Sequence, residues 1–173
     1  LTNLPAQLLE TATNLVTVGD SGTANSGGFQ NTGLKNVPGD MFSYNSKLAS
    51  LDRAFILCYS LTNIEAGALS GATKVTSCYG TFSTCTNLTG TPDGLFSNQI
   101  ACTDYRYVFY GCNSLLSLGN NTFNSGTNST RFDFAFPLTT RLSYIPDTTF
   151  SGCPGATIFG GSADNAGVFE DSG

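Results

Sequence analysis

The sequence predicts a repeat solenoid of α/β to mainly β class, a leucine-rich-repeat-like right-handed coil with parallel strands and short helices. Its most regular feature is a leucine that recurs every 27 residues without insertion or deletion, at Leu34, Leu61, Leu88, Leu115 and Leu142. Phenylalanines recur in the same register, and no segment is long and periodic enough for a long helix. A unit this short cannot bury its apolar face alone, so neighbouring units are expected to stack.

The repeats divide the chain into six coils within a single domain, 1–173. The boundaries are 1–33, 34–60, 61–87, 88–114, 115–141 and 142–173, so the two end coils are longer than the other four. No boundary interrupts the repeats, as expected for one elongated domain. Leu1 already opens a coil in register and is not methionine, which predicts a processed chain or a fragment of a longer one.

Two phenylalanine columns are the predicted core. Numbered from the coil's leucine, position 9 is Leu or Phe in every coil, and position 22 is Phe in four coils: Phe42, Phe96, Phe123 and Phe150 in the first column, Phe55, Phe82, Phe109 and Phe136 in the second. Stacked at about one strand spacing, ~4.8 Å, these side chains would form aromatic ladders. A thin coil needs bulky filling, which favours buried ladders over an exposed platform for sugars or nucleobases.

Each coil also contains two related halves. In the second half, position 18 is expected to point inward and positions 17 and 19 outward, the alternation of a strand. The position 18 residues are Leu51, Cys78, Tyr105 and Phe132. In the first half, a helix of one or two turns is predicted around Gly94–Asn98.

The repeat pattern resembles a known family. Leu-x-x-Ile-Pro-x-x-x-Phe followed by Phe-x-x-Cys-x-x-Leu, as in the segment from Phe109 to Leu115, is similar to the BspA-type leucine-rich repeats of bacterial surface proteins, protist surface proteins and phage-encoded proteins. The resemblance covers the whole chain and departs in the end coils and at Thr139. It implies an extracellular binding or adhesive module and brings no catalytic residues.

The amino-acid composition argues against nucleic-acid binding and against a membrane span. Charged residues make up only 11% of the chain, the net charge is −5, and the seven basic residues are dispersed, so no cationic footprint for nucleic acid is expected. No apolar run approaches the ~20 residues of a membrane span. A neutral polar surface favours an extracellular, cell-surface or virion-surface location. No cofactor is predicted.

The chain has six cysteines: Cys58, Cys78, Cys85, Cys102, Cys112 and Cys153. Three states are open for them, namely buried free thiols, disulfides or a metal site. Three of the cysteines share position 25, which Thr139 occupies in another coil, so buried thiols that act as small fillers are favoured. Stacked column neighbours also lie within reach of a disulfide. A metal site is least favoured, because histidine is absent and no Cys-x-x-Cys pair occurs.

The absence of histidine removes the usual general base, so the chain is predicted not to be an enzyme. A carboxylate-based glycan hydrolase is the remote alternative, with Asp104 and Asp133 as its only plausible pair. Column stacking predicts that Asp104 instead pairs with Arg131 and that Arg106 pairs with Asp133. We therefore interpret these four residues as structural.

A non-catalytic recognition module is the predicted function. Tyrosine and arginine are enriched in interface hot spots, and outward positions here carry both. The candidate partner-binding residues are Arg106, Tyr107, Tyr110, Tyr79 and Arg53, with Asp52 also predicted to face outward. The expected partner is a protein or glycan on a cell surface, and the chain is a candidate component of a larger surface or virion assembly.

Two alternatives accompany this prediction. The first is a passive structural spacer or virion structural component, which would bind no partner. The second concerns the inserted loops Asp20–Gly28 and Gly160–Gly167, which precede Phe29 and Phe169. They are interpreted as parts of terminal caps, with adaptable binding loops as the alternative.

Overall fold

The predicted fold class is wrong. The computed structural model describes residues 2–5, 8–19, 22, 27–124 and 129–156. These residues contain no helix and only two short parallel strands, β1 (Asn36–Val37) and β2 (Asn63–Ile64). The helix expected around Gly94–Asn98 is a series of turns. Most of the described chain is therefore turns and irregular backbone, and not a solenoid of regular strands and short helices.

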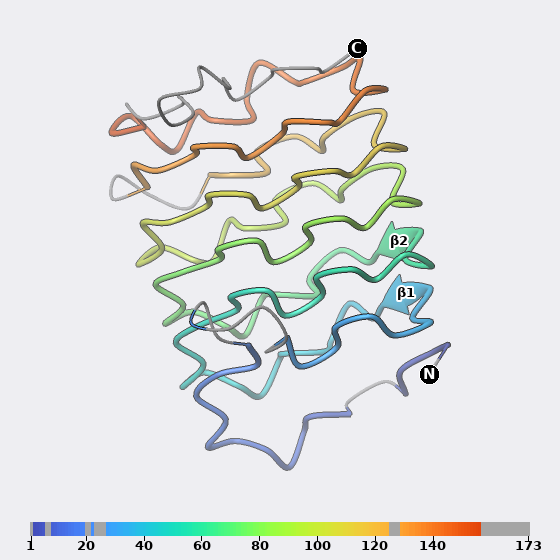
Figure 1. Ribbon diagram of the computed structural model, residues 1–173. Coiled ribbons are helices and arrows are strands. Elements are labelled where there is room, and N and C mark those ends of the chain that lie inside the picture. The colour runs from blue at the N-terminus through green and yellow to red at the C-terminus, as the bar shows by residue number, and fades with distance from the viewer. Residues whose placement is uncertain (1, 6–7, 20–21, 23–26, 125–128, 157–173) are drawn as a thin grey trace.

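Residues from successive sequence repeats nevertheless lie side by side. The chain passes back and forth across the width of the molecule, in layers that follow one another in sequence order (Figure 1). Strand β1 pairs with β2 in the register Asn36↔Asn63 and Val37↔Ile64. Five isolated parallel bridges join further residues 27 apart: Ser50↔Ser77, Ser77↔Asp104, Asp104↔Arg131, Gly90↔Ser117 and Ser117↔Tyr144. Adjacent repeats are thus paired at single points instead of along continuous strands.

The hydrogen-bond pattern explains why strands do not form. The N–H groups of Arg53 and Phe55 donate to carbonyls in the next repeat, at N···O distances of 2.7 and 2.9 Å. The alternate N–H groups, those of Ala54 and Ile56, each donate to the carbonyl three residues earlier, both at 3.1 Å. A strand in a ladder directs its N–H and C=O groups to neighbouring strands. Here every second donor closes a turn, so the backbone cannot stay extended.

The same alternation requires left-handed backbone. Positive φ recurs at positions 20 and 24 of the repeats, at Arg53, Leu57, Gly80, Thr84, Tyr107, Gly111, Phe134 and Leu138. Bulky and β-branched residues rarely adopt this conformation. It persists where surrounding contacts outweigh the local strain, and these positions lie within the segments that bond to the next repeat. Because so few of them are glycine, the sequence does not mark these turns.

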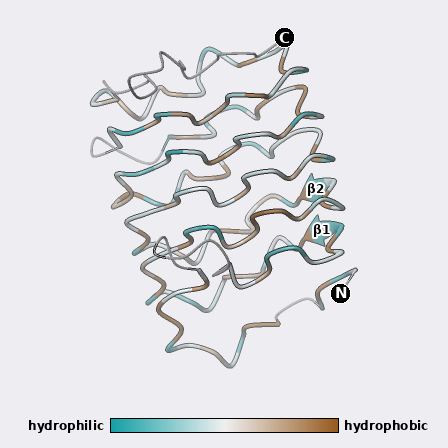
Figure 2. Cartoon of the chain, in the orientation of Figure 1, coloured by the Kyte–Doolittle hydropathy of each residue, from teal (hydrophilic) through white to brown (hydrophobic). Residues whose placement is uncertain are grey.

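The first predicted aromatic ladder is confirmed, and the second is confirmed in part, because Phe42 is buried but lies edge-on to Phe55 at 6.4 Å. Phe55, Phe82, Phe109 and Phe136 are fully buried and stack with ring centroids 5.2–5.9 Å apart. In the second ladder, Phe96 stacks on Phe123 at 5.4 Å, and Phe123 on the half-buried Phe150 at 5.3 Å. Figure 2 shows hydrophobic and hydrophilic stretches alternating along the repeats, with neither kind collected at one end of the molecule.

Two further aromatic residues complete this core. Tyr105 points inward, as predicted for position 18, and stacks on Phe132 at 5.2 Å. Phe29 stacks on Phe55 at 5.3 Å, although it comes seven residues later than the position 22 register would place it. The longer first repeat therefore still supplies an aromatic ring to the same ladder.

Phe109→Ala should lower the free energy of unfolding by about 3–5 kcal/mol, since it removes a fully buried ring in contact with both ladders. Chemical denaturation measures the change, and Asn98→Ala, at an exposed position in the same repeat, is the control. A loss below about 1 kcal/mol would show that the ring is not part of a packed core.

Candidate functional site

The structure brings the five predicted partner-binding residues together. Arg53, Tyr79, Arg106, Tyr107 and Tyr110 form one continuous cluster, which we call the tyrosine–arginine ridge. At its centre, the Tyr79 ring has the guanidinium carbons of Arg53 and Arg106 each 5.2 Å from its centroid. These arginines come from the preceding and the following repeat, so cation–π contacts link three repeats.

Tyr107 extends the cluster. Its ring lies 5.3 Å from Tyr79 and 5.7 Å from Tyr110, and it stacks on Phe134 at 4.9 Å with 12° between the ring planes. All four side chains are half-buried. Burial, followed by the nearby Tyr79, raises the pKa of the Tyr107 hydroxyl. Tyr107 therefore remains a neutral hydrogen-bonding group at physiological pH.

The local backbone positions the ridge. Arg53, Gly80 and Tyr107 occupy position 20 in consecutive repeats, and all three have positive φ. A Cβ atom at Gly80 would lie 3.6 Å from Cγ of Arg53, so the glycine packs directly against the arginine stem. The Arg53 stem thus passes over Gly80, and its guanidinium group lies over the Tyr79 ring.

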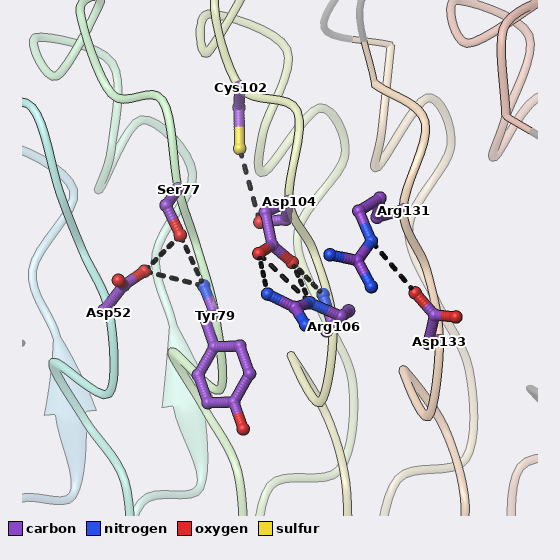
Figure 3. A network of polar contacts seen from close by, with 8 residues as sticks. All are labelled: Asp52, Ser77, Tyr79, Cys102, Asp104, Arg106, Arg131 and Asp133. Atoms are coloured by element: carbon purple, nitrogen blue, oxygen red, sulfur yellow. Dashed lines mark hydrogen bonds and ion pairs between the residues drawn. The ribbon is translucent and has the colours of Figure 1, made fainter. Parts of the chain in front are cut away.

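Asp52 does not face outward as predicted. It is buried and accepts a 2.9 Å hydrogen bond from the Tyr79 backbone N–H and another from the Ser77 hydroxyl (Figure 3). The carboxylate thus supplies an acceptor to the Tyr79 N–H of the next repeat. Its role is therefore to fix the backbone of Tyr79 under the ridge.

The predicted ion pairs between repeats are also wrong. Asp104 binds Arg106 of its own repeat at 2.6 Å, and Asp133 binds Arg131 at 3.4 Å (Figure 3). Positions 17 and 19 lie on the same side of the backbone, so a short carboxylate reaches the arginine two residues away more directly than the one in the next repeat. The bridge Asp104↔Arg131 still makes the two pairs neighbours.

These pairs bear on the hydrolase alternative. Asp104 receives three contacts from the Arg106 guanidinium group at 2.6–3.1 Å, and this hydrogen bonding raises the pKa of Arg106. Asp133 likewise has an arginine within 4 Å. The arrangement is that of two ion pairs and gives no support to a pair of catalytic carboxylates.

The six cysteines are buried and lie in no disulfide. Several thiols donate to a carbonyl 30 residues earlier: Cys85 to Phe55 and Cys112 to Phe82, both at 3.2 Å. In the first half of the repeat, Gln99 does the same for Leu69 at 2.8 Å. The cysteine column therefore satisfies buried backbone carbonyls, a role that the sequence reading missed. Gln99, the counterpart of Cys112 in the other half of the same repeat, is the signal that pointed to a polar role.

An open pocket lies on another part of the surface, between 62–66 and 89–92. Sequence reasoning missed it. Two consecutive residues of the sequence could have indicated it, because Gly90 and Thr91 stand where the preceding repeat has Asn63 and Ile64.

The predicted loops cannot be placed. Gly160–Gly167 lies outside the described residues, as does Phe169, and only Gly22, Gly27 and Gly28 of the first loop are described. Among the residues that the structure covers, no group of three potential metal ligands comes together, and no helix is suited to cross a membrane.

No family model matches the chain, and no curated protein matches it. The resemblance to BspA-type repeats therefore stays a prediction.

The buried thiols predict a loss of stability at alkaline pH. Burial raises the pKa of Cys112 from about 9.0 to about 12, and it also raises the pKa values of Cys58, Cys78 and Cys85. A group with a raised pKa in the folded state stabilises the fold below its unfolded pKa. Stability should therefore fall as the pH rises from about 9 towards 12, by up to about 1.4 kcal/mol per pH unit for each thiol.

Denaturation of the wild type and of Cys112→Ala at several pH values tests this. The variant has one fewer titrating thiol, so its stability should depend less steeply on pH between 9 and 11, on the order of one proton less. All other ionisable groups are common to both proteins, so their contributions cancel in the comparison. Identical slopes would contradict the buried, protonated state of Cys112.

Proposed function

We propose that this protein is a non-catalytic recognition module that binds a protein or glycan partner through the tyrosine–arginine ridge. The supporting observation is the assembly of Arg53, Tyr79, Arg106, Tyr107 and Tyr110 from three repeats into one half-buried cluster. Tyrosine and arginine supply much of the binding energy in known interfaces. A surface on a cell or virion is the proposed setting.

The ridge suits binding because its side chains are already ordered. Binding immobilises flexible side chains at a cost of about 0.5–1.5 kcal/mol each. Here Arg106 is held by Asp104 at 2.6 Å and lies over Tyr79, and Tyr107 is stacked on Phe134. Much of this ordering therefore precedes contact with a partner.

Charge on the ridge is largely balanced within the molecule. Arg106 is paired with Asp104, and Arg131 beside it is paired with Asp133. A partner selected by simple charge attraction would require a surplus of one sign. Shape, ring edges and tyrosine hydroxyls are therefore the features proposed to select the partner.

A passive spacer is the competing function, and it would bind nothing. The triple variant Arg106→Ala, Tyr107→Ala, Tyr110→Ala should weaken binding to whole cells, or to immobilised protein and glycan panels, by at least about a hundredfold. The variant should remain folded, because the three side chains lie outside the phenylalanine ladders, and its thermal midpoint checks this.

The matched control is the triple variant Tyr44→Ala, Tyr144→Ala, Arg141→Ala, which removes the same residue types from exposed positions outside the ridge. It should bind like the wild type. If the ridge variant also binds like the wild type, the proposed site is wrong. If the wild type binds nothing in these panels, the spacer is favoured.

A further inference from the structure

We propose that the pocket between 62–66 and 89–92 binds an N-acetylated amino sugar and holds it by its acetamido group. The pocket has a volume of about 460 Å³ and is lined by residues of two adjacent repeats: Thr62, Asn63, Ile64, Glu65, Ala66, Thr89, Gly90, Thr91 and Pro92. None of these residues belongs to the tyrosine–arginine ridge. The inference therefore does not depend on the function proposed for the ridge.

The pocket coincides with a break in the pairing between repeats. Strand β1 pairs with β2 through Asn36↔Asn63, and pairing resumes at Gly90↔Ser117. Between Asn63 and Gly90 there is no bridge, and within the described chain no hydrogen bond joins 62–66 to 89–92. In the preceding repeat, the Lys35 carbonyl accepts from Thr62 at 3.0 Å and from Asn63 at 3.3 Å. Within the described residues, the Thr62 carbonyl accepts no equivalent hydrogen bond from the following repeat.

Two residues at the break lack donors that the preceding repeat supplies. In the paired repeats, the Glu65 N–H donates to the Val37 carbonyl at 3.0 Å. The residue that would make the same bond to the Ile64 carbonyl is Pro92, which has no N–H. Gly90 in turn lacks the side chain that Asn36 and Asn63 carry at this position. The sequence therefore removes both a backbone donor and an amide group from one place.

The missing amide is the most specific feature. The Asn63 side-chain N–H donates to the Asn36 side-chain oxygen at 2.7 Å, so the amides of adjacent repeats pair at this position, an arrangement that we call the amide ladder. The Asn36 side-chain N–H itself donates to Glu65 at 2.6 Å. The next amide would belong to residue 90 and would donate to Oδ1 of Asn63. Gly90 leaves that place open: a Cβ atom there would meet only Ser117, at 3.6–3.7 Å.

A ligand amide fits this place. An acetamido N–H can donate to Oδ1 of Asn63, and its carbonyl can accept from the Gly90 N–H, which continues the ladder. Ala66 and Pro92 supply apolar contact for the methyl group, and sugar hydroxyls can donate to the carbonyls of Thr62 and Ile64.

A neutral ligand is favoured over a cation. Glu65 is the only ionisable residue in the pocket lining, and its carboxylate already accepts from the Asn36 side chain at 2.6 Å and from the Gly39 N–H at 2.9 Å. These bonds lower the pKa of Glu65 and direct the charge towards the preceding repeat. The Gly90 backbone N–H on the opposite wall is directed to an acceptor, which a cation lacks.

Amide-resolved NMR titration of the full chain tests this inference with N-acetylglucosamine and its disaccharide. Shifts should concentrate at Gly90, Thr91 and the Asn63 side-chain amide. Glucose, which lacks the acetamido group, should bind at least about tenfold more weakly. Equal responses to glucose and N-acetylglucosamine, or no shift at these residues, would overturn the proposal. Equal affinity for propionamide would also overturn it, because the sugar ring would then contribute nothing.

Variants separate the amide site from general effects on folding. Gly90→Asn should supply the missing amide from the chain itself and abolish binding, whereas Gly90→Ala should leave the place open and retain binding within about threefold. Equal loss in both variants would contradict the amide ladder. The ridge triple variant should bind N-acetylglucosamine like the wild type, so failure of one proposal is distinguishable from failure of the other.

Discussion

Donation of every second backbone N–H to the following repeat is the constraint on which the rest of this structure depends. In 51–57, 78–84 and 105–111, four such bonds leave each segment for the next. Of the three intervening N–H groups, the first bonds to a side chain and the other two close turns of their own. This arrangement satisfies the backbone without extended strands. Each bond joins a residue to the carbonyl 26 positions later, which is the residue just before its equivalent in the next repeat. An insertion or deletion in one repeat would shift all four bonds, so the 27-residue spacing is maintained.

The buried side chains complete what the backbone leaves unsatisfied. Cys85, Cys112 and Gln99 each donate to a carbonyl 30 residues earlier. Burying a polar group without a partner costs free energy, so a small donor at this position is useful in every repeat. Burial of these thiols also raises their pKa values, because loss of solvation disfavours the thiolate.

The ridge and the pocket arise from opposite uses of the repeat. The ridge depends on regular stacking, which places Arg53, Tyr79 and Arg106 next to one another across three repeats. The pocket lies at a departure from regularity, where Gly90 lacks the amide that Asn36 and Asn63 carry and Pro92 lacks a backbone N–H. One surface thus gains ordered side chains, while the other gains peptide groups available to a ligand.

The sequence by itself determined which residues become neighbours and which apolar side chains are buried. A fixed 27-residue register predicted the phenylalanine ladders, the inward position of Tyr105 and the meeting of the ridge residues. It could not predict the backbone path, because left-handed turns at Arg53, Leu57 and Tyr107 carry no glycine signal. It also could not predict local polar partners. Asp104 pairs with the arginine two residues away and not with the one in the next repeat. Asp52 is buried and accepts from the Tyr79 N–H. Those choices depend on side-chain reach and backbone direction, which only the tertiary structure sets.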